Sequence, residues 1–255
     1  MNKLVIASAI LMLGIAGAYF VVRNATMAPQ TAVVTPEQNT NIDSAHPFVE
    51  QPSAAPSSLG QTPTNLTEDF TQNLTQQIAA ANPNGPDTSS GQPQIAVPDA
   101  NAISQQLLTE EAQKFDPSIL NPVIKDSDLR VSNDNSKAAL STYIAQFEKI
   151  VTDAAQNIPA SAVTGSPTLD QVSLFIPAYK NAIGAFYALS VPSSALDIQK
   201  TELTLLTKKF NILSAIANYN DDPITTAFVA PELQKVDQEF ADFNTQFSNF
   251  VKASA

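Results

Sequence analysis

Residues 229–250, VAPELQKVDQEFADFNTQFSNF, decide the fold class of this chain. Apolar side chains recur in this stretch at alternating steps of four and three residues, at Val229, Leu233, Val236, Phe240, Phe243, Phe247 and Phe250. This spacing follows the 3.6-residue turn of an α-helix and places one apolar stripe along it. The stretch therefore predicts a long helix that buries its stripe, Phe243 included, against other helices.

Three upstream stretches repeat the pattern, so the predicted helix at 229–250 has three other amphipathic helices to pack against. Their stripes are Leu140, Ile144, Phe147, Val151, Ala154 and Ile158, then Val172, Ile176, Tyr179, Ile183 and Phe186, then Leu203, Leu206, Phe210, Leu213 and Ala217. Short breaks separate the stripes, at 159–167, 192–194 and 221–223. Because short connections make neighbouring helices antiparallel, we expect an all-α, antiparallel up-down bundle of about four long helices.

Prolines and strand signals refine this prediction. Pro177 and Pro231 fall within the striped stretches and should kink or break their helices. No segment alternates polar and apolar residues at period two, and the chain has only seven glycines for hairpin turns. We therefore expect no β-strand.

One or two shorter helices are expected before the bundle. The first should begin after Asn65, which forms a plausible capping box with Glu68 three residues later. It carries Leu66, Phe70, Leu74 and Ile78 at every fourth position and should end at Asn82-Pro83. The second follows Asp99 as its N-cap and carries Ile103, Leu107 and Leu108. Residues 116–132 contain two prolines and are expected to be irregular.

The chain begins with an apolar run. Residues 4–22 carry no charge and lie between Lys3 and Arg23. A helix of this length spans roughly 28 Å, close to the hydrocarbon thickness of a bilayer. We therefore expect residues 4–22 to be a single transmembrane helix that holds the protein in a membrane.

Two alternatives remain open at this run. The small residues 16–18 could form a signal-peptidase site, in which case the protein would be secreted after cleavage near Ala18. Gly14 and Ala18 form a small-xxx-small pair, so homo-oligomerisation through packed anchors is a further alternative.

The distribution of positive charge predicts the orientation in the membrane. No Lys or Arg occurs between Arg23 and Lys114. Because positive residues are retained on the cytoplasmic side, the N-terminus should be cytoplasmic and the C-terminal bulk extracytoplasmic. The predicted organisation is a transmembrane anchor (1–23), a disordered linker rich in Pro, Thr, Gln and Ser (24–64), a short helix and loop (65–98) and a helical bundle domain (99–255).

Composition excludes several classes of function. The formal net charge of −11 repels phosphate backbones, so we expect no nucleic-acid partner. The chain has no cysteine, and its one histidine, His46, lies in the predicted linker. A nucleophile–base pair and a transition-metal site are therefore not expected.

Four groups of residues are candidate functional sites, and each has a simpler structural explanation. The phenylalanines at 240, 243, 247 and 250 are expected to be core rather than a ligand groove. Asp126, Asp128 and Asp134 lack the glycine and terminal glutamate of a calcium loop. Asp221-Asp222 is expected to cap the last helix, and Glu110-Glu111 to lie on a solvated helix face. We therefore predict no catalytic, cofactor-binding or metal-binding residue, no cofactor and no enzymatic activity.

Two short motifs resemble those of a known group. The segment LRVSNDNS at 129–136, followed by Tyr143, and the segment YNDDP at 219–223 resemble recurring motifs in uncharacterised single-pass, exported helical-bundle proteins of the ultra-small candidate-phyla bacteria. The resemblance covers roughly residues 65–252. It implies a bacterial origin and an envelope location, and it supplies no catalytic residues.

Two functions fit these features. The first is a membrane-anchored, extracytoplasmic structural or protein-interaction component of the cell envelope, with another envelope protein as its partner. The alternative is an extracytoplasmic ligand-binding or sensor module without an output domain of its own.

Overall fold

The computed structural model describes residues 65–86, 94–96, 99–159 and 169–254. The predicted anchor (1–23), the predicted linker (24–64) and His46 lie outside the described residues. Within the described part, no helix combines the length and the apolar character needed to cross a membrane.

The described chain is all-α, as the periodicity predicts, with 76% of it in helices. The elements in chain order are α2 (Leu66–Ala81), α3 (Ala100–Lys114), η1 (Pro117–Leu120), η2 (Asp126–Asp128), β1 (Arg130–Ser132), α4 (Lys137–Gln156), α6 (Leu169–Val172), α7 (Ile176–Ala188), β2 (Ser190–Pro192), η3 (Ser193–Ala195), α8 (Leu196–Ala217) and α9 (Pro223–Ser254).

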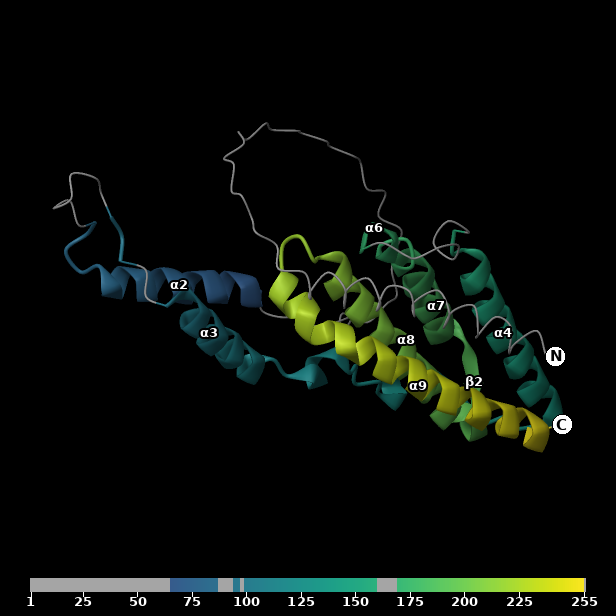
Figure 1. Cartoon of the computed structure of the whole chain (residues 1–255). Helices are drawn as coiled ribbons and strands as arrows, with labels where there is room; N and C mark the ends of the chain where they lie inside the picture. The colour runs from purple at the N-terminus through teal and green to yellow at the C-terminus, as the bar shows by residue number, and fades with distance from the viewer. Residues whose placement is uncertain (1–64, 87–93, 97–98, 160–168, 255) are drawn as a thin grey trace.

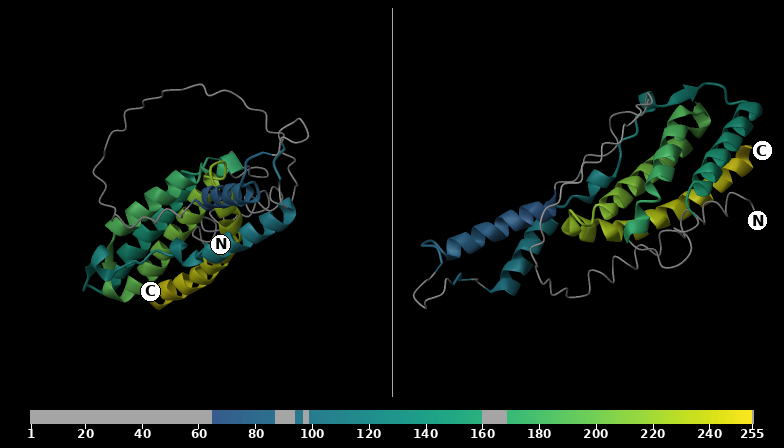
Figure 2. Two further views of the ribbon diagram at one scale, coloured as in Figure 1. Left: turned by 90° about the vertical axis from the view of Figure 1, so that its left-hand side faces the viewer. Right: turned by 90° about the horizontal axis from the view of Figure 1, so that it is seen from above.

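The elements form two regions (Figures 1 and 2). The body consists of α4, α6, α7, α8 and α9 with the short strands and 3-10 turns. The arm consists of α2 and α3, which pack on each other and extend away from one end of the body. The arm is thus a pair of helices that projects from a body in which more helices pack together.

The body is built around α8, which packs against α7 and α9 and also against α6, η1, η3 and β2. With neighbours on so many sides, α8 buries more than the single predicted stripe, and that prediction is wrong for this helix. Its buried apolar residues are Ile198, Leu203, Leu205, Leu206, Ile212, Leu213 and Ile216.

Aromatic rings fill the core between α4, α7 and α9. The ring centroid of Phe147 lies 4.2 Å from that of Phe247 and 4.8 Å from that of Phe186. Phe243 is 4% exposed, so its predicted burial is confirmed. Phe240 and Phe250 lie half-buried at the margin of this core.

Pro177 marks a break rather than a kink. The predicted helix through 172–186 is two helices, because α6 ends at Val172 and α7 begins at Ile176 with Pro177 in its first turn. A proline is well tolerated there because the first helical N–H groups have no partner within the helix. Pro231 lies inside α9, which continues on both sides of it.

A short parallel ladder contradicts the expectation of no strand. β1 pairs with β2 in the register Arg130 to Ser190, Val131 to Val191 and Ser132 to Pro192. Asn135, just after β1, accepts a hydrogen bond from Ser194 N at 2.9 Å and so fixes this loop to the turn after β2. Strands of three residues are too short to show the alternation that predicts strands from sequence.

Candidate functional site

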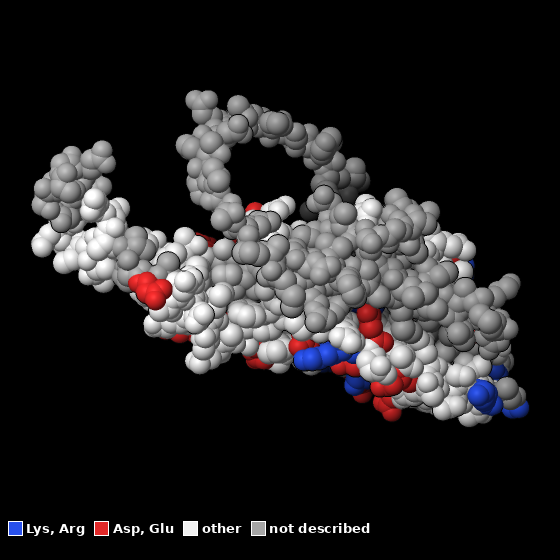
Figure 3. Space-filling model, in the orientation of Figure 1, with Lys and Arg blue, Asp and Glu red and all other residues white. Residues whose placement is uncertain are grey.

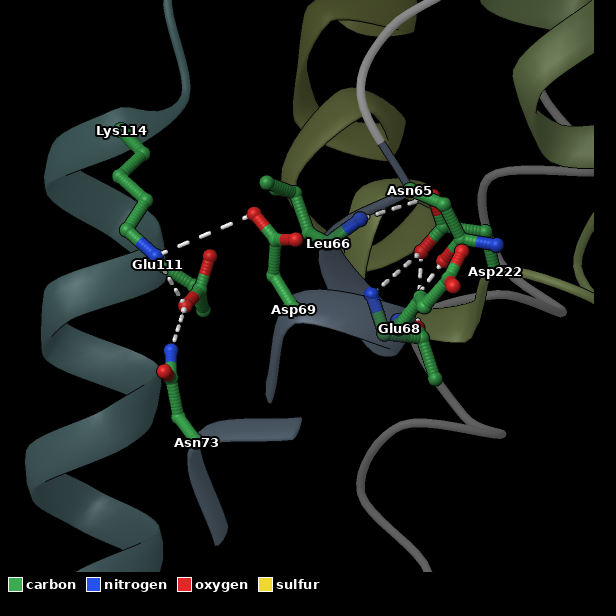
Figure 4. A network of polar contacts seen from close by, with 9 residues as sticks. Asn65, Leu66, Glu68, Asp69, Asn73, Glu111, Lys114 and Asp222 are labelled. Carbon is green, nitrogen blue, oxygen red and sulfur yellow. Dashed lines mark hydrogen bonds and ion pairs between the residues drawn. The ribbon is translucent and has the colours of Figure 1, made fainter. Parts of the chain in front are cut away.

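A network of polar contacts makes up the joint between the arm and the body (Figure 4). It forms where the N-terminus of α2 meets the N-terminus of α9, so that the two helices run away from each other in Figure 1. Asp222, which is 5% exposed, lies between the two helix ends. A carboxylate is favoured there because both helix dipoles present their positive ends to it.

The Asp222 carboxylate caps both helices. Its Oδ1 accepts hydrogen bonds from Thr225 N of α9 at 3.1 Å and from Thr67 N of α2 at 3.2 Å. Its Oδ2 accepts from Leu66 N at 3.3 Å. The predicted capping of α9 is confirmed, whereas the capping of α2, from a position 156 residues away, was not predicted.

Thr67 of α2 adds two further hydrogen bonds between the arm and the body. Its hydroxyl donates to Asp222 Oδ1 at 2.8 Å and accepts from Ile224 N at 3.1 Å. Through these hydrogen bonds, the Asp222 carboxylate links the first turn of α2 to the first turn of α9. The joint therefore fixes the direction in which the arm leaves the body.

The helix ends of the arm are otherwise capped much as predicted. Asn65 accepts from Glu68 N at 2.9 Å, and Asp99 accepts from Asn101 N at 3.0 Å. The capping box is thus confirmed in its Asn65 half. The Glu68 side chain accepts instead from Gln72 Nε2 at 3.4 Å.

A polar brace joins α2 to α3, and it corrects a prediction. Glu111, expected on a solvated face, is 0% exposed. Its Oε1 accepts from Lys114 Nζ at 2.7 Å and from Asn73 Nδ2 of α2 at 3.3 Å, while Oε2 has no hydrogen-bond partner among the described residues. Asp69 Oδ2 lies 3.9 Å from the same ammonium. The hydrogen bond to Glu111 raises the pKa of Lys114.

The apolar stripe of α3 is narrower than predicted. Ile103 and Leu107 are buried, but Leu108 is 43% exposed. The reason is that, in the described part of the chain, α3 packs mainly against α2, so the width of one helix sets the width of the buried stripe.

A hollow of about 550 Å³ lies at the tip of the arm, lined by residues 81–86 and 94–96. Asn82 shapes it, because its side chain donates to Ala96 O at 2.8 Å and accepts from Ala96 N at 2.8 Å. None of the described lining residues carries a charge, so these residues offer a ligand hydrogen bonds and apolar contacts.

The three aspartates that form the candidate cation site, Asp126, Asp128 and Asp134, each interact with a different group. Asp126 Oδ1 pairs with Lys200 Nζ at 2.7 Å, and Asp128 accepts from Lys125 N at 3.1 Å. Hydrogen bonds from Ser136 hold the pKa of Asp134 below its ordinary value. Nowhere in the described ranges do three or more His, Cys, Asp or Glu side chains gather as metal ligands.

The second polar cluster lies inside the body, where the sequence predicted only apolar core. Tyr143 of α4 donates to Gln199 Oε1 of α8 at 2.9 Å, and Gln199 Nε2 donates to Phe186 O at 2.6 Å. Burial raises the pKa of Tyr143 and of Tyr179. No helical periodicity reveals these polar positions, since they share the faces of their apolar neighbours.

An ion pair lies on the face of α8 that packs against α9. Lys209 of α8 is buried and pairs with Asp237 of α9, and its Nζ is also 5.3 Å from the ring centroid of Phe240. Burial lowers the pKa of Lys209 and raises that of Asp237, while their mutual attraction opposes both shifts. The pair is held in a packed interface and joins α8 to α9.

Comparison of the chain with protein-family models, with curated proteins and with solved structures finds no significant match.

Proposed function

We propose that this protein is a membrane-anchored, extracytoplasmic interaction component of the bacterial cell envelope, and that its arm is the surface that a partner protein recognises. In this proposal residues 4–22 anchor the chain and residues 24–64 hold the folded region away from the membrane. The body acts as an antiparallel up-down bundle that supports the arm.

The observation that carries the proposal is the arm itself. It projects beyond the body as two packed helices, with α2 alone about 24 Å long. It is fixed at its base through Asp222, so its direction is set before any partner binds. Preorganisation of this kind lowers the entropic cost of association.

The exposed surface of the arm suits a protein partner. Its visible face is mainly uncharged, whereas acidic and basic side chains mix along the middle of the body (Figure 3). About half of the exposed residues of α2 and α3 carry an amide or a hydroxyl: Thr71, Gln72, Thr75, Gln76, Asn101, Gln105, Gln106, Thr109 and Gln113. Such groups both donate and accept hydrogen bonds. Lys114 is the only cation in the described part of the arm, which disfavours nucleic acid.

Site-specific photo-crosslinking in cells that express the full chain tests the proposal. A photoreactive residue replaces Gln76, which is exposed on α2, or Gln146, which is exposed on α4 and serves as the matched control. We expect a discrete crosslinked protein from position 76 and none from position 146. A discrete product from position 146 alone would place recognition on the body and contradict the proposal.

The proposed location has a separate test. Protease added outside intact cells should cleave the C-terminal bulk, because the distribution of Lys and Arg predicts that this part lies outside the cytoplasm. Protection of residues 30–255 under these conditions would contradict the location without deciding whether the arm binds a partner.

A further inference from the structure

Glu202 is a carboxyl group inside the body that the proposed function does not use. It lies on α8 and is 4% exposed. It forms no ion pair with any residue that the structure describes, in contrast to the other buried charges of α8. A buried carboxylate without a cation is costly, and such a group usually takes up a proton instead.

Among the described residues, the groups that sense the charge of Glu202 from the neighbouring helices are tyrosines, not cations. Glu202 acts electrostatically on Tyr143 of α4 and on Tyr179 of α7, whose side chains are also buried. Asp237 of α9 acts electrostatically on Tyr179, as Glu202 does. None of these three groups carries a positive charge that would favour a charged Glu202.

The remaining elements around α8 do not change this balance. η1, β2 and η3 carry no titratable side chain, and neither do Gln171 and Val172, the described side chains of α6. Lys209, on α8 itself, lies two turns further along, about 10 Å by helix rise, and is already paired with Asp237. Lys208 is paired with Glu239 at 2.8 Å.

We propose that Glu202 is protonated in the folded body, so that folding takes up one proton and the body loosens when its surroundings become alkaline. The device is independent of the arm and of any partner. It would make the stability of an extracytoplasmic protein respond to the pH outside the cell.

The sign of the effect follows from linkage. Burial raises the pKa of Glu202 from 4.5 to about 8 in the folded body. Below pH 4.5 both the folded and the unfolded chain hold this proton, and the stability contributed by the neutral group is fully present. Between about pH 4.5 and pH 8 only the folded chain holds it, so stability falls as the pH rises. Above about pH 8 the loss is complete.

Urea unfolding of the full chain in mild detergent, followed from pH 5 to pH 9, tests the proposal. Glu202→Gln keeps the shape of the side chain but cannot lose a proton. Relative to this variant, the unfolding constant of the wild type should rise about tenfold per pH unit up to about pH 8 and then level off. Glu148→Gln, at an exposed position of α4, is the matched control and should run parallel to the wild type. Parallel curves for Glu202→Gln and wild type would overturn the proposal.

A second measurement keeps the test decisive if Glu202→Gln does not fold. The ¹³C carboxyl resonance of Glu202 in the wild-type chain reports its protonation directly. A midpoint near pH 8, or a neutral carboxyl up to the pH of unfolding, supports the proposal. A midpoint near pH 4 to 5 overturns it.

Discussion

The arm and the body hold their helices together by different means. In the body, Phe147 stacks on Phe247 and meets Phe186 edge-on, and many apolar residues around them are buried. In the arm, Phe70, Leu74 and Ile78 of α2 are only half-buried. The arm depends instead on polar contacts at its base and along its length.

This difference follows from the number of helices in each region. Two helices cover only one stripe of each other and leave the remaining faces to solvent, whereas additional helices close around a common core. The arm thereby gains exposed surface at the expense of packing. A few polar groups, Asp222 and Glu111 above all, therefore carry a larger share of its order than any polar group carries in the body.

The largest effect should come from the aromatic core. Phe147→Ala removes a buried ring that packs near four other aromatic rings, and it should lower the free energy of unfolding by about 3–5 kcal/mol, measured by urea unfolding. Leu74→Ala, at a half-buried position of the arm, is the comparison and should cost about 1 kcal/mol. Equal losses at the two positions would show that the arm is packed as tightly as the body.

The next largest effect should come from the ion pair between α8 and α9. Lys209→Met leaves Asp237 partly buried without its cation and should cost about 2–4 kcal/mol in urea unfolding. The double variant Lys209→Met/Asp237→Leu removes both charges and should recover most of this loss. A double variant as unstable as the single one would mean that Lys209 stabilises by packing, not by its charge.

The sequence predicts the parts of this fold that repeat along the chain. The all-α class, the burial of Phe243, the ends of α2 and the capping by Asp99 and Asp222 all follow from local spacing and local chemistry. These features involve residues within a few turns of each other, so a single stretch of sequence contains all the information they need.

The polar sites could not be predicted in the same way, because their partners are distant in sequence. Glu111 resembles any surface glutamate until Asn73 of α2 is placed against it. Glu202 occupies a position on α8 that becomes buried only because several elements pack around that helix. The capping of α2 by Asp222 likewise requires two helix ends to meet in space.

A moderate effect, but a localised one, should follow from loss of the joint. Asp222→Ala removes the acceptor shared by the first turns of α2 and α9, while Asn65 still caps α2, and it should cost about 1–2 kcal/mol. Hydrogen exchange should quicken most at the first turns of α2 and α9, because those amides lose their acceptor. Asp99 caps only α3, so Asp99→Ala is the matched control. In this variant, faster exchange should be confined to α3. Slower or unchanged exchange at α2 in Asp222→Ala would show that the arm is held by other contacts.

The smallest effect is expected at Glu111, although this side chain is completely buried. Glu111→Gln keeps an oxygen that can accept from Lys114 and Asn73, and it replaces a charged group whose Oε2 has no partner among the described residues. The lost charge and the lower desolvation cost oppose each other, so the free energy of unfolding should change by less than about 1 kcal/mol. The pKa of Lys114 should fall toward its ordinary value, because the hydrogen bond from Lys114 to the charged carboxylate raises it now. Urea unfolding together with an NMR titration of Lys114 measures both quantities. If Glu111→Gln destabilised the protein as much as Asp222→Ala, the arm would depend on the brace between its helices as strongly as on its joint with the body.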